Sequence, residues 1–343
     1  MDELDIMQTQ DNEPFSLVLS QLFGGGEIKV SRLFRLSDMS ARETTQFERS
    51  WAQADTRTRQ ILARHMADIA EENFEVEFSP VFQHFLADVD ETVKMAALDG
   101  LWDTTNVNTV RPIIDIMANV KNSAELRRAA ASTLAHFVLL GEWGQISHYV
   151  RDRVVDALLE QHENEENAEA VRCAALEAVG SSGNERVPEL IIEAYDSGDR
   201  RLQTSAIFAM GSSADDRWLY TIIEEMDSPY YDMRIEAARA AGEIGSEEAI
   251  APLANLVFDE EEEVGLMSIA ALGKIGGERA KLVLKNICAE DDLIHLGDAA
   301  KAALSQSDGL PNEIDLDFDD YDDEEDVYND GDYLDDDYYG RIL

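Results

Sequence analysis

The sequence is poor in the residues that form redox, disulfide and metal sites. It has two cysteines and six histidines in 343 residues, too few for a disulfide framework or a cluster of thiolate ligands. No apolar run reaches the length of a membrane span, and the acidic start lacks the basic and apolar regions of a signal peptide. We therefore expect a cytoplasmic protein that does not insert into membranes.

Positive charge is also scarce. The chain has 28 Lys and Arg against 72 Asp and Glu, which gives a formal net charge of −44. Residues 311–343 hold fifteen acids and one arginine, so most of the excess lies in the rest of the chain. Such a field repels nucleic-acid phosphates and attracts basic partners at salt-sensitive rates. We expect no nucleic-acid partner and favour a basic protein partner, with a purely solubilising role of the charge as the alternative.

Catalytic and cofactor motifs are missing as well. The sequence has no Walker motif and no Gly-x-Gly-x-x-Gly that opens a helix. Asp315, Asp317 and Asp319 alternate as in a calcium loop, but Asp320 stands where that loop needs glycine. We therefore predict no catalytic residue, no cofactor and no metal site, and we regard an enzyme as the minority hypothesis.

The chain does contain a repeat, in which an apolar residue precedes a run of small residues. The aligned apolar positions are Val93, Leu126, Val171, Leu202, Met233 and Val264. The last four are equally spaced, and a fixed period of about 31 residues is typical of solenoids built from stacked helix pairs. We predict an all-α fold, a right-handed α-solenoid of about seven helix pairs whose second helices line a concave surface.

One unit shows where its helices are expected to begin and end. Residues 168–180 carry apolar side chains at helical spacing, and Gly180 follows them at the position of a left-handed C-cap. Residues 186–196 form the second helix, with Pro188 in its first turn. The unit over 123–166 is longer, and we assign its extra length to loops. The glycines that match Gly180 are Gly100, Gly211, Gly242 and Gly273.

The expected domains follow from where this period holds. We predict a partly flexible N-terminal segment over 1–30, a divergent helical cap over 31–80, the repeat solenoid over 81–306 and a disordered Asp/Tyr-rich tail over 307–343. The tail has three interpretations: a solubilising brush, a binding segment for a basic partner, or a segment that folds back onto basic N-terminal helices.

The expected cap has two further features. Two helices are predicted over 37–54 and 56–73, with Ser37 and Thr56 as their N-caps. Residues 27–65 are the locally basic part of the chain, with eight basic against five acidic side chains.

The run E/D-x-V/L/M-R/K-x-x-A-A-x-A-L-G, together with the proline of the second helix, resembles HEAT repeats. The resemblance covers about 90–306 and is strongest to the short bacterial repeats first associated with phycobilin lyases. In that family the basic residue often pairs with an acid of an adjacent repeat. This implies an ion-pair ladder, interrupted at Gln203 and Gly265, through Lys94, Arg127, Arg172 and Arg234. The iron hydroxylase built from such repeats uses recurring His-Glu dipeptides, and only His162-Glu163 occurs here.

The expected function is that of a non-catalytic protein-binding scaffold or adaptor, which holds a basic macromolecular partner on the concave face. The alternative rests on the resemblance alone and is a phycobilin-type chromophore lyase or isomerase, or its accessory subunit. The sequence identifies neither the partner nor the oligomeric state. The expected partner-binding residues are acids and aromatics that we take to be exposed, namely Trp143, Glu193, Tyr195, Glu224, Glu225 and Asp259.

Overall fold

The computed structural model describes residues 13–24, 28–73, 76–289 and 294–307. Within these ranges the secondary structure is entirely helical and contains no strand, which confirms the predicted all-α solenoid class. The tail predicted beyond residue 307 and half of the predicted N-terminal segment lie outside the described residues. The right hand of the superhelix stays a prediction.

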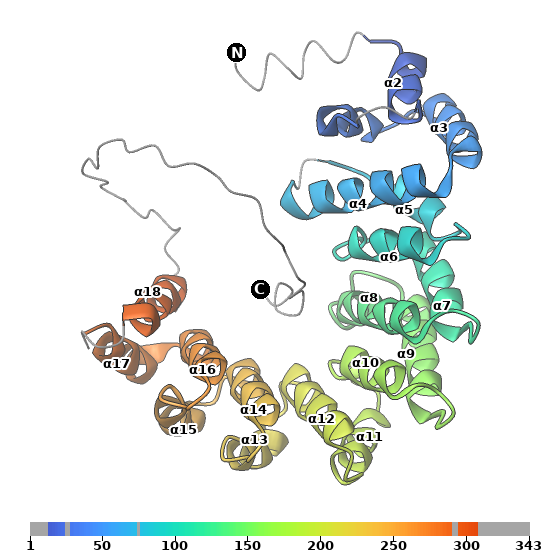
Figure 1. Ribbon diagram of the computed structural model, residues 1–343. Coiled ribbons are helices and arrows are strands. Elements are labelled where there is room, and N and C mark those ends of the chain that lie inside the picture. The colour runs from blue at the N-terminus through green and yellow to red at the C-terminus, as the bar shows by residue number, and fades with distance from the viewer. Residues whose placement is uncertain (1–12, 25–27, 74–75, 290–293, 308–343) are drawn as a thin grey trace, which may run out of the picture. The chain divides into compact units, whose positions relative to one another are not determined.

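In the described part of the chain, five helical segments precede the regular repeats (Figure 1). The apolar residues of 14–23 form a short amphipathic helix. The segments are α2 (Phe15–Leu22), η1 (Val30–Leu36), α3 (Ala41–Gln53), α4 (Thr56–Glu72) and α5 (Ser79–Phe85).

The N-caps of α3 and α4 differ from the predicted ones. Ser40 caps α3 in a capping box, in which the Glu43 side chain accepts from the Ser40 backbone N–H at 3.0 Å. Asp55 caps α4 and accepts from the backbone of Thr58. Ser37 instead accepts a hydrogen bond from the backbone N–H of Glu77 through its hydroxyl oxygen. The predictions of Ser37 and Thr56 as N-caps were therefore wrong, because a better acceptor lies within three residues of each.

The repeats alternate a first and a second helix, and short 3-10 turns precede several second helices. The first helices are α6 (Glu91–Asp99), α8 (Ala124–Glu142), α10 (Glu169–Val179), α12 (Arg200–Ser212), α14 (Tyr231–Ile244), α16 (Glu262–Ile275) and α18 (Ile294–Ser307). The second helices are α7 (Val110–Ala118), α9 (His148–Glu163), α11 (Val187–Tyr195), α13 (Leu219–Glu225), α15 (Ile250–Leu256) and α17 (Gly277–Cys288). The 3-10 turns are η2 (Val107–Thr109), η3 (Asp216–Trp218) and η4 (Glu247–Ala249).

The long repeat owes its extra length to its helices. The first helix α8 has 19 residues and the second helix α9 has 16, against 11 and 9 in α10 and α11. The extra length was predicted for loops over 141–145 and 162–167. The prediction was wrong in the main, because most of the length lies in the two helices and α8 and α9 extend two residues into these segments.

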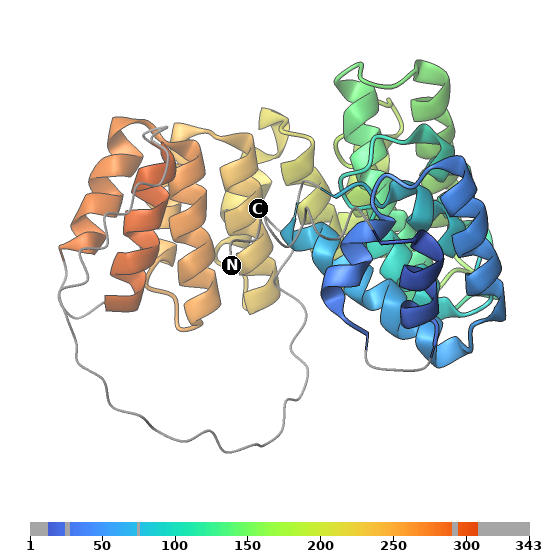
Figure 2. The same ribbon diagram turned by 90° about the horizontal axis from the view of Figure 1, so that it is seen from above.

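The first helices form one continuous row in which each packs on the next, from α4 to α18. Each second helix packs on the first helix of the following repeat, as α11 does on α12 and α13 on α14. Seen from above, the helices of residues 200–307 stand side by side (Figure 2). Because α4 packs on α6, this row extends into the region predicted as a divergent cap.

The repeating glycines allow the close approach of neighbouring first helices. A Cβ on Gly180, Gly211 or Gly242 would lie 2.6–2.9 Å from the Cα of an alanine in the next first helix, closer than side chains are found to approach. Gly180 has a φ of −54°, so it is not the left-handed C-cap that we predicted. The regular spacing of these glycines thus reflects helix–helix contact rather than helix termination.

When the helices of one row lie closer to one another than those of the other row, the whole stack curves toward the closely packed row. In the repeats over 187–288, the first helices α12, α14 and α16 lie on the inner side of the second helices α11, α13 and α15 (Figure 1). The prediction that second helices line the concave surface was therefore wrong for these repeats. The sequence shows the small residues, but which row they bring together depends on the packing.

The predicted ion-pair ladder is instead a series of contacts to main-chain carbonyls. Near the N-termini of the four first helices α8, α10, α12 and α14, one side chain donates to a carbonyl at or just after the end of the preceding second helix. Arg127 donates to Met117 at 2.7 Å, Arg172 to His162 at 3.0 Å, Gln203 to Tyr195 at 2.9 Å and Arg234 to Ser228 at 2.9 Å.

Gln203 therefore continues the series that we expected it to interrupt. At Gly265 a Cβ would lie 2.6 Å from the carbonyl oxygen of Val257, so no side chain fits there. Arg234 does form an ion pair with an acid toward the next repeat, namely Asp259. Arg127 donates to Gln161 and Asn167 instead, and burial lowers its pKa.

Candidate functional site

The six predicted partner-binding residues fall into three places. Trp143 lies alone, directly after α8, with 64% of its surface exposed. Glu193 is exposed on α11 and forms an ion pair with Arg186, with 3.1 Å between Nη1 of the arginine and Oε1 of the glutamate. The other four lie at or after the C-terminal ends of α11, α13 and α15, so they border the turns between repeats.

Tyr195 and Glu225 join two consecutive repeats. The Tyr195 hydroxyl donates to the Glu225 carboxylate, from the end of α11 to the end of α13. Burial raises the pKa of Tyr195, and the hydrogen bond to Glu225 raises it further, so the hydroxyl stays protonated. Glu224 is exposed beside this contact. Tyr195 and Glu225 therefore hold the repeats together, while Glu224 is free to face solvent.

Asp259 was predicted to be an exposed acid, but most of its side chain is buried. Arg234 binds its carboxylate through two hydrogen bonds of 2.7 Å, and the two side chains are only 9% and 10% exposed. Burial opposes ionisation of Asp259, but the hydrogen bonds from Arg234 and from the backbone of Glu261 lower its pKa overall. Asp259 is thus half of a buried brace.

This brace connects two successive inter-repeat turns. Arg234 also donates to the Ser228 carbonyl at 2.9 Å, in the turn that precedes α14. Asp259 in turn lies in the turn that precedes α16 and accepts from the Glu261 backbone at 2.9 Å. The two turns are therefore held at a fixed distance by one arginine.

Three aromatic side chains project from these braced turns. Tyr230 and Tyr231 are each 47% exposed, and Phe258 is 57% exposed. Exposed acids surround them in both turns. We define the acidic turn surface by the residues Asp227, Tyr230, Tyr231, Phe258, Glu260, Glu261 and Glu263.

The aromatics of this surface were not among the predicted partner-binding residues. Their signal in the sequence is that Tyr230 and Tyr231 lie between Asp227 and Asp232, and that Phe258 precedes the run of acids over 259–263. Periodicity pointed instead to the second helices, because the packing that pins the turns is not visible in the sequence.

A cation already lies against one of these aromatic rings. The Arg200 guanidinium is 5.0 Å from the centre of the Tyr230 ring, and its Nε is 3.2 Å from the Asp232 carboxylate. A ring and a carboxylate that together accept a guanidinium make the pair of contacts that a basic ligand uses. The basic residues at this surface, Arg200 and Arg234, are both bound to acids, so its remaining charge is negative.

The inner row contains a second group of ionisable side chains. The largely buried carboxylate of Glu177 on α10 accepts from the Ser205 hydroxyl on α12. Burial raises the pKa of Glu177, and nearby Glu236 adds to this, while Arg239 and Arg128 oppose it. Arg239 lies 3.8 Å from the centre of the Phe208 ring and donates to Glu236 at 2.8 Å. These contacts stabilise the stack and leave no open site.

We expect this buried carboxyl to make stability depend on pH. The folded state holds the Glu177 proton more tightly than the unfolded chain does, so it binds more protons. The free energy of unfolding therefore falls as pH rises from about 4.5, the ordinary value. Glu177→Gln keeps a partner for Ser205 and removes the ionisation. The variant should be more stable than the unmodified chain at neutral pH, by a margin that shrinks toward pH 4.5.

Urea unfolding across this pH range, followed by circular dichroism, measures the effect. The exposed Glu193→Gln is the control and should leave the pH dependence unchanged. A difference between Glu177→Gln and the unmodified chain that is constant across the range would contradict the assignment.

His162 and Cys173 lie in the packed interior of the repeats. His162 is buried, its Nδ1 lies 2.9 Å from the Arg172 carbonyl, and burial lowers its pKa. Burial raises the pKa of the Cys173 thiol to about 11. Among the described residues, no group of three or more His, Cys, Asp or Glu is placed to hold a metal ion. No helix in the same ranges is long and apolar enough to cross a membrane.

Two family models match parts of the chain. The model for HEAT repeats matches residues 219–305, which include the acidic turn surface. The model for the PBS lyase HEAT-like repeat matches residues 171–197. No curated protein matches the sequence. The matched ranges lie within the segment where the repeat was predicted, and they confirm the resemblance on which that prediction drew.

Solved structures of helical-repeat proteins are similar over most of the chain, at low identity. Human deoxyhypusine hydroxylase in complex with glycerol is 13% identical, with 90% of this chain and 100% of that chain covered and a TM-score of 0.34. A structure of Kap95p binding to RanGDP is 15% identical, with 89% and 43% covered and a TM-score of 0.42. Kap121p is 14% identical, with 90% and 42% covered and a TM-score of 0.39. The partner and the activity named here belong to those proteins.

Proposed function

We propose that this HEAT-like repeat protein is a non-catalytic adaptor that binds a basic segment of a partner protein on its acidic turn surface. The observation that carries the proposal is the set of three exposed aromatics held among acids by the Arg234–Asp259 brace. Repeat solenoids bind ligands along extended surfaces built from successive repeats, and this surface spans two of them.

The proposed mechanism has an electrostatic and a contact stage. The net charge of −44 attracts a basic segment and raises its rate of encounter, an effect that salt weakens. Arg or Lys side chains of the segment then lie against the rings of Tyr230, Tyr231 and Phe258 and pair with Glu260, Glu261 and Asp227. Aromatic residues commonly supply most of the binding free energy at such interfaces. The brace fixes the turns beforehand, so little ordering is needed on binding.

The structure gives the second expected function, a phycobilin-type lyase, no specific support. The match to the PBS lyase HEAT-like repeat covers residues 171–197, and these residues carry packing side chains and the ion pair of Glu193. A repeat match describes how helices stack, whereas an activity depends on a site.

Replacement of the three aromatics tests the proposal directly. We expect the full chain to bind a labelled peptide rich in Arg and Lys, measured by fluorescence anisotropy at about 50 mM salt and more weakly at about 200 mM. The variant Tyr230→Ser/Tyr231→Ser/Phe258→Ser should bind at least about tenfold more weakly, because each lost aromatic contact is worth about 1 kcal/mol or more.

The matched control replaces exposed aromatics elsewhere, as Tyr149→Ser/Tyr220→Ser, each of which is 71% exposed. It removes similar rings and should leave the affinity unchanged. An equal loss in the control would mean that the peptide follows the net charge rather than the surface, and would contradict the proposal.

A further inference from the structure

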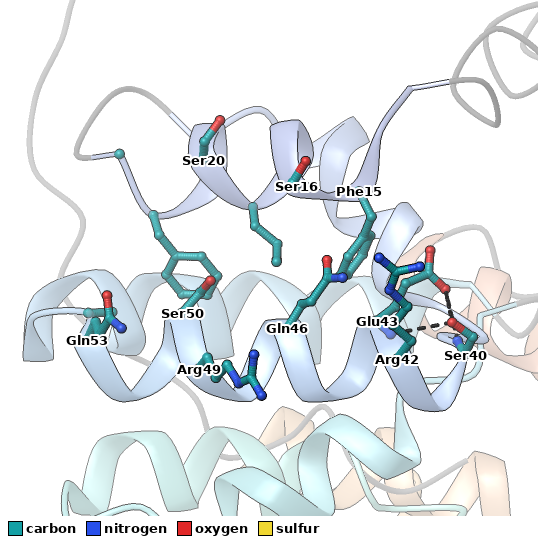
Figure 3. Close-up of a pocket in the computed structure, with 14 residues that line it drawn as sticks. Phe15, Ser16, Ser20, Ser40, Arg42, Glu43, Gln46, Arg49, Ser50 and Gln53 are labelled. Atoms are coloured by element: carbon teal, nitrogen blue, oxygen red, sulfur yellow. Dashed lines mark hydrogen bonds between the residues drawn. The ribbon is translucent and has the colours of Figure 1, made fainter.

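A groove with the opposite charge preference lies at the N-terminal end of the described chain. It has a volume of about 1130 Å³ and runs between α2 and α3 (Figure 3). Phe15, Leu19 and Phe23 supply its apolar part. Gln46, Ser50 and Gln53 line it from α3, and Figure 3 shows the Gln46 side chain reaching toward α2. The groove therefore combines an apolar floor with neutral hydrogen-bonding groups.

Two arginines without carboxylate partners among the described residues line this groove. Arg42 and Arg49 are exposed on α3, and neither forms an ion pair with another described residue. They are seven residues apart on one helix, about 10.5 Å along its axis. In a chain with 72 acids and 28 basic residues, these two arginines belong to the locally basic part of the sequence. They add two positive charges to the rim of the groove.

The one acid that lines the groove does not cancel this charge. Glu43 accepts from Arg35 at 2.8 Å and from the Ser40 hydroxyl at 2.6 Å. The hydrogen bonds from Ser40 lower the pKa of Glu43, with a smaller contribution from Arg35. Arg35 also lies 5.5 Å from the centre of the Phe15 ring. The Glu43 carboxylate is therefore already neutralised by its own partner, and Arg42 and Arg49 stay available.

We infer that this groove binds an acidic segment of a partner protein, in which two carboxylates flank an apolar side chain. The carboxylates pair with Arg42 and Arg49, and the apolar side chain lies against Leu19 and Phe23. Positions i and i+7 of a bound helix match the spacing of the two arginines, because they share the helical rise of α3. A helix in an apolar groove is a common mode of peptide recognition. The inference does not depend on the acidic turn surface, which takes a ligand of opposite charge.

The test uses the full chain and a labelled peptide rich in Glu and Leu, with anisotropy at about 50 mM salt as the readout. We expect binding that weakens at least about tenfold in Arg42→Gln/Arg49→Gln, about 1.4 kcal/mol in binding free energy, because the variant loses both charge-assisted hydrogen bonds. Both arginines are exposed, so the variant should fold normally. The basic peptide used for the acidic turn surface should bind this variant as before, so the two proposals fail independently.

The matched control is Lys29→Gln/Arg57→Gln. It removes the same charge from two exposed cations that do not line the groove, and it should leave the affinity unchanged. Equal loss in both variants would overturn the inference, since attraction would then be unspecific. A single-stranded oligonucleotide that binds more tightly, with the same dependence on Arg42 and Arg49, would overturn it in favour of nucleic acid. Binding that requires removal of residues 311–343 would overturn it in favour of the chain's own acidic segment.

Discussion

The substitution Gly211→Ala is expected to destabilise the solenoid by about 2–3 kcal/mol, although alanine is the better helix former. The added Cβ would lie 2.6 Å from the Cα and 2.7 Å from the Cβ of Ala240 on the next first helix. Neither atom belongs to a flexible side chain, so α12 and α14 must move apart. Separation costs packing along both helices, and the helix propensity gained, about 0.5–1 kcal/mol, does not compensate. Urea unfolding followed by circular dichroism measures the change.

Gly297→Ala provides the matched control in the same protein. Gly297 lies within α18, and a Cβ there meets no atom within 4 Å. This substitution should therefore stabilise the chain by about 0.5–1 kcal/mol through helix propensity alone. If both variants changed stability in the same direction, close helix contact would not explain the repeating glycines.

The second large effect is expected for Arg234→Ala, which should lower the free energy of unfolding by about 3 kcal/mol or more. The substitution leaves the Asp259 carboxylate, 10% exposed, without its cation, and removal of one partner of a buried pair typically costs about 3–5 kcal/mol. It also frees the Ser228 carbonyl that Arg234 binds. The same urea unfolding experiment applies.

Two variants make this prediction specific. Arg111→Ala removes an exposed ion pair with Asp115, in which the two side chains are 67% and 58% exposed. It should lower the free energy of unfolding by less than about 0.5 kcal/mol. The double variant Arg234→Met/Asp259→Leu should recover much of the loss, because it leaves no charge uncompensated. If Arg234→Ala cost no more than Arg111→Ala, the brace would not hold the two turns together.

The brace matters for function as well as for stability. Tyr230 and Tyr231 lie in one turn and Phe258 lies in the next. The relative position of these two turns depends on Arg234 and Asp259. A binding surface spread over two turns needs such a connection, because unconnected turns would lose conformational freedom on binding. The residues with the strongest structural role are therefore next to those proposed to touch the partner.

The sequence alone was sufficient for the fold class and for the position of most repeats. The regular period and the alternation of apolar and small residues determine helix pairs that must stack to bury their faces. Local signals also located α11, whose predicted range of 186–196 agrees with the observed Val187–Tyr195. Such features depend on neighbours in sequence, so they can be recognised without a structure.

The tertiary structure decided what the repeated residues do. Gly180 looked like a helix terminator from its position, and only the neighbouring alanine shows that it allows close packing. Asp259 looked like a free surface acid, and only Arg234, 25 residues away, shows that it is buried in a brace. Exposure and pairing depend on residues brought together by folding, so a single sequence cannot supply them. The net negative charge was therefore predictable, whereas the acidic turn surface and the groove of Arg42 and Arg49 became visible only in the folded chain.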